Sequence, residues 1–124
     1  MSIKYTPDHE WISIDGNQAT IGITHHAQDA LGDVVFVDLP EVGKSYATKD
    51  TAAVVESVKA AADVYIPAAG VVTEVNEELR ADPSLANSDP LGAGWFFKMT
   101  LSDPAELDAM MDETSYTAFA ADAH

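Results

Sequence analysis

Lys59 stands in a segment whose residue types favour a specific chemistry. The motif Glu56-Ser57-Val58-Lys59-Ala60 lies between two runs rich in alanine and valine, which is typical of the tip of a β-hairpin. A lysine at such a tip has no built-in partner, so its ammonium is either simply hydrated or is the target of covalent modification. An exposed tip would let a modifying enzyme reach the amine and would let a long acyl arm swing clear of its own domain.

Other nucleophilic and metal-ligating residue types do not form a site with recognisable spacing. The chain has no cysteine, which excludes thiol nucleophiles, disulfides and thiolate metal sites. His9, His25 and His26 could suggest a metal, but adjacent histidines rarely point at one ion, so we expect no metal site. Ser57 has no histidine near it in the sequence to activate it. We therefore expect no catalytic residues and a protein that is not an autonomous enzyme.

Composition limits the classes of partner. The chain has 124 residues, about one domain, and 47% of them are apolar. Six Lys and Arg against 21 Asp and Glu give a net charge of −15, which repels nucleic-acid backbones and anionic lipid. No apolar run approaches the roughly 20 residues of a membrane-spanning helix. We expect a cytoplasmic protein without a nucleic-acid or membrane role, whose acidity reflects either solvation in a salty environment or steering toward basic partners.

Most of the chain predicts short strands. Residues 10–14 and 18–23 flank Asp15-Gly16-Asn17, a strong hairpin signal. The further predicted elements are, in order, a helix over 27–31 closed by Gly32, strands over 34–39, 52–57, 60–66 and 71–75, an irregular loop over 76–89 with a helical turn near 77–79, and a strand over 94–101.

In the C-terminal segment the spacing of apolar residues changes from that of a strand to that of a helix. Asp103-Pro104-Ala105-Glu106 is a helix-capping signature, with Asp at the N-cap and Pro at the first helical position. The residues expected on the buried side of the helix that follows are Leu107, Met110 and Met111, with Tyr116 and Phe119 further on. No linker divides the chain, so residues 1–124 are expected to form one domain with a frayed tail at 120–124.

Many short motifs occur in a characteristic order. Besides Glu56-Ser57-Val58-Lys59-Ala60, they are Tyr5-Thr6-Pro7-Asp8-His9-Glu10-Trp11, Ile21-Gly22-Ile23-Thr24, Ala27-Gln28, Leu31-Gly32-Asp33-Val34-Val35-Phe36-Val37, Leu39-Pro40-Glu41-Val42-Gly43, Asp63-Val64-Tyr65-Ile66-Pro67, Gly70-Val71-Val72, Glu74-Val75-Asn76, Pro83, Leu85-Ala86-Asn87, Asp89-Pro90 and Gly94-Trp95. This ordered set, spread over about residues 3–116, resembles the glycine cleavage H-protein family, and the lysine motif resembles its lipoylation signature.

The resemblance implies a fold, a cofactor and partners. The fold is all-β, the barrel-sandwich hybrid of lipoyl and biotinyl domains with short helices, including one at the C-terminus. The cofactor is a lipoyl group amide-linked to Lys59. The partners are a pyridoxal-phosphate glycine decarboxylase that loads an aminomethyl group, a tetrahydrofolate-dependent aminomethyltransferase that removes it, a dihydrolipoamide dehydrogenase that reoxidises the dithiol, and the enzyme that attaches lipoate. This is a carrier role in glycine catabolism and one-carbon metabolism.

The resemblance also implies a protective cleft. An aminomethyl thioether hydrolyses when water reaches it, and in the family the loaded arm folds into a cleft of its own protein. By position, the residues implied to meet the aminomethyl ammonium are Glu10, Asp8 and Asp63, although some relatives carry a serine where Asp8 stands. The alternative is that all three are ordinary exposed acids among 21.

Three other functions remain as alternatives. Lipoyl or biotinyl domains of other complexes are usually shorter, lie beside flexible linkers and favour Asp-Lys-Ala or Met-Lys-Met around the lysine, unlike Val58-Lys59-Ala60. A related lipoyl protein that serves another pathway, such as lipoyl relay or sulfur oxidation, would keep Lys59 and bind different enzymes. An unmodified acidic binding protein with the same fold would not need Lys59.

Overall fold

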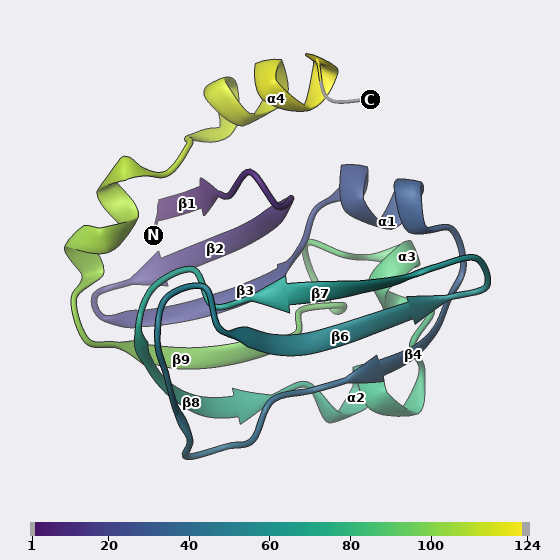
Figure 1. Ribbon diagram of the computed structural model, residues 1–124, viewed down its shortest axis with the longest axis horizontal. Helices are drawn as coiled ribbons and strands as arrows, with labels where there is room; N and C mark the ends of the chain where they lie inside the picture. The colour runs from purple at the N-terminus through teal and green to yellow at the C-terminus, as the bar shows by residue number, and fades with distance from the viewer. Residues whose placement is uncertain (1, 123–124) are drawn as a thin grey trace.

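The computed structural model describes residues 2–122 and consists mainly of short strands in two antiparallel sheets (Figure 1). The larger sheet has the order β1 (Ser2–Tyr5), β2 (Glu10–Asp15), β3 (Gln18–Ile23), β9 (Phe97–Leu101), β8 (Gly70–Val75) and β5 (Ser45–Tyr46). The smaller sheet has the order β4 (Val34–Asp38), β6 (Thr51–Ser57) and β7 (Ala61–Tyr65). The helices are α1 (His25–Leu31), α2 (Glu77–Ala81), α3 (Leu85–Ser88), a 3₁₀ helix (Pro104–Ala109) and α4 (Glu113–Asp122).

The expected all-β fold with short helices is confirmed, and the described strands form no closed barrel. One core joins the sheets, because alternate residues of each strand point inward. The inward side chains of β9 are Phe97, Met99 and Leu101, and they share one cluster with Val55 of β6 and Val64 of β7. Each fully buried side chain of this size contributes about 1.5–3 kcal/mol relative to exposure. No helix among residues 2–122 is long and apolar enough to cross a membrane.

The two predicted hairpins are present. In β2–β3, Asp15 pairs with Gln18, which leaves a two-residue turn whose first residue, Gly16, has φ 65°. Glycine adopts this conformation without steric cost, and glycine first is typical of a tight hairpin turn. In β6–β7, the Ser57 N–H donates to the Ala60 carbonyl at 2.8 Å and closes the tip.

Helix α1 begins earlier than expected, at His25 instead of residue 27. The reason is Thr24, whose Oγ1 caps the helix by accepting a hydrogen bond from the Ala27 N–H at 3.3 Å. The predicted end is correct, since Gly32 follows Leu31 with φ 78°.

The helical turn expected near 77–79 is present as the start of α2. The irregular loop expected for the rest of 76–89 is wrong, because this segment contains two helices, α2 and α3. Each is shorter than two turns, but each buries one apolar side chain in the core, Leu79 in α2 and Ala86 in α3. The Asn76 amide anchors the start of the segment by donating to the carbonyls of Ala93 and Trp95 at 2.8 Å each. Packing therefore stabilises helices that are too short to form alone.

The single helix expected after Asp103 is also wrong, although Asp103 does cap a helix start through Ala105 N–H. The chain forms a 3₁₀ helix, then extends, and then forms α4. In the extended part Met111 makes a β-bridge with Tyr5, so Met110 and Met111 do not lie on a helical face. Residues 120–122 belong to α4, and the rest of the expected frayed tail lies outside the described residues. Strands β1 and β5 had no counterpart in the predictions.

Candidate functional site: a cleft beside an exposed lysine

Lys59 lies at the exposed tip of the β6–β7 hairpin, as predicted. The turn is held by the Ser57 hydroxyl, whose Oγ accepts from the N–H groups of Lys59 at 3.3 Å and Ala60 at 3.1 Å. The same hydroxyl donates to the Ala60 carbonyl at 3.1 Å. Ser57 therefore shapes the turn that presents Lys59, which explains a serine at this position without any nucleophilic role.

The tip rests on the turn between α1 and β4. The Val58 N–H donates to the Asp33 carbonyl at 3.1 Å. The Lys59 stem passes so close to Gly32 that a Cβ at that position would lie 3.2 Å from Lys59 Cε. A glycine with positive φ thus ends α1 and also leaves room for the lysine side chain.

The Asn87 side chain on α3 holds this supporting turn. Its Oδ1 accepts from the Val34 N–H at 2.8 Å, and its Nδ2 donates to the Gly32 carbonyl at 2.8 Å and to Gln28 Oε1 at 2.9 Å. One amide therefore joins α1, β4 and α3 behind the tip. The role of Asn87 has no local signal in the sequence, because its partners lie more than fifty residues away.

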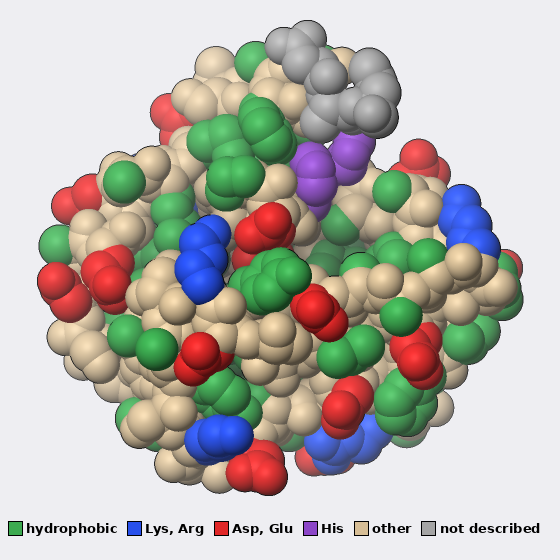
Figure 2. Space-filling model, in the orientation of Figure 1, with side chains coloured by type: hydrophobic (Ala, Val, Ile, Leu, Met, Phe, Trp, Pro, Cys, Tyr) green, Lys and Arg blue, Asp and Glu red, His purple; other side chains and the backbone are tan. Residues whose placement is uncertain are grey.

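A cleft of about 320 Å³ begins beside the tip and extends to Glu10. Its lining residues are Asp8, His9, Glu10, Ile23, Ala27, Ala30, Leu31, Val55, Ala60, Ala61, Ala62, Asp63 and Val64. The five alanines keep the space open, because none of them extends beyond Cβ. Figure 2 shows a hollow below the histidine side chains, with acidic side chains beside it. A lysine-linked group could enter this cleft from the tip.

Glu10 is the buried carboxylate of the cleft, with only 2% of its surface exposed. Its Oε1 accepts from the Thr6 hydroxyl at 3.1 Å and its Oε2 from the Tyr65 N–H at 2.6 Å. Burial is the largest influence and raises the pKa of Glu10 to about 7, although both hydrogen bonds oppose this shift. The carboxyl group therefore changes protonation close to neutral pH.

The structure places Asp8 and Asp63 on the same cleft as Glu10, and both side chains are exposed. Asp8 also lies 3.8 Å from the Lys49 ammonium, an exposed pair that contributes little stability. The Thr6 hydroxyl organises the loop by accepting from the N–H groups of Asp8 and Glu10 at 3.2 Å each. Thr6 was missed from sequence, because nothing but its place in a matching motif marked it.

His9 adopts a left-handed conformation with φ 65°, and its ring lines the cleft. Its Nδ1 lies 2.7 Å from the Tyr116 hydroxyl of α4, and its ring stacks on His26 with centroids 4.2 Å apart. Burial and the neighbouring His26 lower the pKa of His9. Within residues 2–122, no group of three or more His, Cys, Asp or Glu side chains is placed to hold a metal ion.

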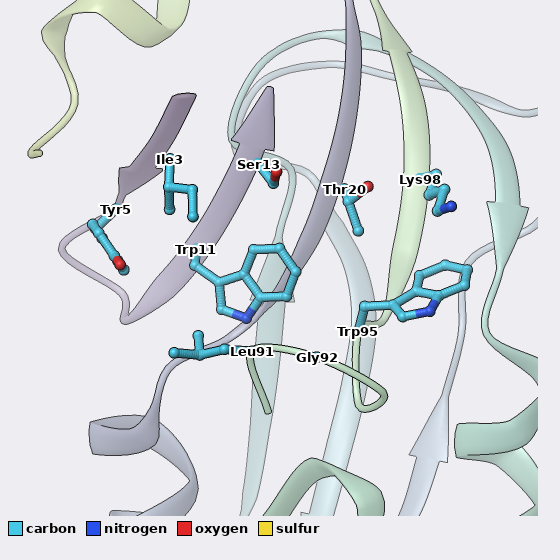
Figure 3. A pocket seen from close by; sticks show the side chains of 9 residues that line it. All are labelled: Ile3, Tyr5, Trp11, Ser13, Thr20, Leu91, Gly92, Trp95 and Lys98. Atoms are coloured by element: carbon cyan, nitrogen blue, oxygen red, sulfur yellow. The ribbon is translucent and has the colours of Figure 1, made fainter. Parts of the chain in front are cut away.

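A second cavity of about 320 Å³ lies on the outer face of the larger sheet (Figure 3). Trp11 follows Glu10 on β2 and points to the opposite face, so this cavity is separate from the cleft. Its indole covers Gly22, where a Cβ would lie 2.7 Å from the ring, and its Nε1 donates to the Pro90 carbonyl at 2.9 Å. The other side chains shown there are Ile3, Tyr5, Ser13, Thr20, Leu91, Trp95 and Lys98, and none is a carboxylate.

Comparison with known proteins gives the family. The model of the glycine cleavage H-protein family matches residues 3–123. The chain belongs to this family. The family predicted from the ordered motifs is thereby confirmed. The matched range includes the hairpin, the cleft and all of α4.

Individual relatives agree along nearly the whole length. The glycine cleavage system H protein of Thermotoga maritima is 56% identical over 118 residues, which cover 95% of each chain. That of Phenylobacterium zucineum is 55% identical over 119 residues, which cover 96% of this chain and 98% of the relative. The crystal structure of a glycine cleavage system H protein from Mycobacterium marinum superposes with a TM-score of 0.86 at 36% identity, covering 94% of both chains.

Proposed function

We propose that this chain is the lipoyl carrier of a glycine cleavage system and bears the lipoyl group on Lys59. It carries an aminomethyl group from a pyridoxal-phosphate glycine decarboxylase to a tetrahydrofolate-dependent aminomethyltransferase. A dihydrolipoamide dehydrogenase then restores the oxidised carrier. The observation that supports this proposal best is the cleft that starts beside the exposed Lys59 and ends at the buried carboxylate of Glu10.

The residues around Lys59 suit a lipoyl group. The tip exposes the amine to an attaching enzyme, and an amide there removes the charge of the lysine. Alanines and aliphatic side chains line the path from Ala60 inward, as an aliphatic chain requires. When bound, the lipoyl group supplies a dithiolane that can be reduced and can hold a one-carbon amine.

The carboxylates give the cleft affinity for a cation. Glu10, Asp8 and Asp63 converge on the same space, and Glu10 is shielded from water. An ammonium that enters favours the ionised form of Glu10, so the cation replaces the proton that burial otherwise retains near pH 7. A charge pair in such a part-dry cleft is stronger than the same pair in open water. The chain thus holds and protects its cargo, while the bond-making steps belong to its partners.

A reconstituted assay tests the function. The chain is first lipoylated with a lipoate ligase, lipoate and ATP, and is then added to glycine decarboxylase, aminomethyltransferase and dihydrolipoamide dehydrogenase with glycine, tetrahydrofolate and NAD. We expect glycine-dependent NADH formation with the native chain and none with Lys59→Arg. The variant keeps the fold, because a tip residue buries little surface. NADH formation with the folded Lys59→Arg variant, or none with the fully lipoylated native chain, would contradict the proposal.

A further inference from the structure

Three large apolar side chains lie exposed around the lysine tip. Val35 is 55% exposed, Phe36 is 50% exposed and Val58 is 70% exposed. We call these three residues the tip patch. Val58 precedes Lys59 directly, and Phe36 lies opposite Glu56 across the β4–β6 pairing. Scattered exposed apolar residues need no explanation, but a group beside one functional position marks an interaction surface.

A β-bulge places two of these side chains outward. The pairing of β4 with β6 runs from Val34 opposite Ser57 to Phe36 opposite Glu56, so Val35 is the extra residue. Val34 and Val37 are buried, whereas Val35 and Phe36 between them are both exposed. Regular alternation would have turned one of the two toward the core. The bulge therefore exposes apolar surface that a regular strand would have buried in part.

Acidic groups surround the tip patch. Asp33 and Asp38 flank its β4 residues, and Glu56 lies opposite Phe36; all three are exposed. Lys59 is the only basic residue in β4, β6, β7 and the turn between β6 and β7. A partner that covers this surface needs an apolar socket with basic residues at its border.

We infer that the tip patch is the docking surface for the enzyme that attaches lipoate to Lys59, an inference that rests on the proposed function. That enzyme must bring its reacting atoms to Nζ of Lys59 itself. In the reaction the amine displaces AMP from the adenylate formed from lipoate and ATP, so an N–C bond forms, the C–O bond to AMP breaks, and the amine loses a proton. The mouth of its active site therefore has to cover the side chains next to the tip. Enzymes that react with the far end of the arm do not need to approach Lys59 so closely.

Lipoylation kinetics test the inference. The unmodified native chain, Phe36→Ser, Val58→Ser and the control Val42→Ser are compared with a lipoate ligase, lipoate and ATP, with product followed by intact mass. Val42 is 58% exposed and lies outside the tip patch, in the segment between β4 and β5. We expect kcat/KM to fall at least tenfold for Phe36→Ser and Val58→Ser, mainly through KM, and to stay within twofold for Val42→Ser. Phe36→Leu, which keeps an apolar side chain, is expected to restore most of the rate.

Two outcomes would overturn the inference. The first is an equal rate for Phe36→Ser, Val58→Ser and Val42→Ser while the native chain is lipoylated normally. The second is an equal loss in the reduction of the fully lipoylated variants by dihydrolipoamide dehydrogenase, because the patch would then serve every partner. Failure of the native chain to be lipoylated is a different result and counts against the proposed function itself.

Discussion

Glu10 is subject to two opposing influences. Loss of hydration favours its neutral form, while the Thr6 hydroxyl and the Tyr65 N–H donate to its two oxygens and favour its ionised form. Burial prevails, and the pKa reaches about 7. A cation that enters the cleft therefore shifts the pKa of this carboxyl group strongly. The pKa of an exposed carboxylate in water would shift much less.

The raised pKa of Glu10 predicts a pH-dependent stability. Its ordinary pKa is 4.5 and its folded pKa is about 7, so the folded state binds more protons between these values. The contribution to the free energy of unfolding is complete below pH 4.5 and is lost as the pH rises through 7, by about 3 kcal/mol in total. Urea unfolding of the native chain and of Glu10→Gln is compared at pH 4 to 8. We expect the native chain to lose stability relative to Glu10→Gln over this window. A difference that does not change with pH would contradict the shift.

Glu10 is also expected to protect the cargo. Glu10→Ala removes the buried partner of the ammonium and admits water, so we expect the lifetime of the aminomethyl-loaded carrier to fall roughly tenfold, equivalent to about 1.4 kcal/mol. The loaded form is prepared with glycine decarboxylase, and its decay is followed by mass. Glu74→Ala, which removes an exposed strand carboxylate outside the cleft, is the control. Equal lifetimes for both variants would remove Glu10 from this role.

At the scale of elements, the lysine hairpin is positioned by contacts behind it and not by its own strands alone. The turn after α1 touches the tip through the Asp33 carbonyl and Gly32, and the Asn87 amide of α3 fixes that turn. The short helix α3 thus helps to position the lysine hairpin, although Ala86 is its only buried residue.

Loss of this amide should affect both stability and modification. Asn87→Ala removes three hydrogen bonds and leaves the Val34 N–H without its side-chain partner, so we expect the free energy of unfolding to fall by about 2 kcal/mol. We also expect slower lipoylation at Lys59, because the turn beneath the tip loosens. Ser88→Ala, at an exposed position of the same helix, is the control. Equal stability and equal lipoylation rates for the two variants would show that Asn87 does not support the tip.

Local signals predicted some elements well. The hairpin at Gly16 and the end of α1 at Gly32 follow from residues within a few positions, since only glycine adopts these φ values easily. The helices in 76–89 and the break at Met111 depend on distant partners, namely the buried position of Leu79 and the bridge to Tyr5. Such contacts have no local sequence pattern, so we expected a loop with a single helical turn in one place and one continuous helix in the other.

The exposed lysine and the carboxylates of the site were predictable from the sequence, but the residues that support them were not. The exposed tip at Lys59 follows from its strand-flanked motif, and Glu10, Asp8 and Asp63 lie on one cleft as the family resemblance implies. Thr6 could not be found in this way, because its role is to hold another residue across a folded loop.

At the scale of the whole molecule, both sheets and the helices α1, α2 and α3 contribute to one core cluster. A smaller cluster of Tyr5, Trp11 and Tyr116 joins β1 and β2 to α4. We therefore propose that residues 1–124 form one domain. The chain carries a net charge of −15, which opposes compaction by self-repulsion.

This charge predicts a stabilising effect of salt. Raising NaCl from 0.05 to 0.5 M at pH 7.5 shortens the screening length and weakens the repulsion among the carboxylates. We expect the midpoint of thermal unfolding to rise by roughly 3–5 °C, since about 1 kcal/mol corresponds to a few degrees in a chain of this size. Circular dichroism and tryptophan fluorescence measure the midpoint. A midpoint that is unchanged or lower at high salt would show that repulsion does not limit stability.

Peptide mapping shows directly whether Lys59 carries the lipoyl group. The native chain is incubated with a lipoate ligase, lipoate and ATP, digested, and analysed by tandem mass spectrometry. We predict a gain of one lipoyl group, located on Lys59 alone. No gain while the ligase modifies a control substrate, or a lipoyl group on any of the other lysines, would contradict it.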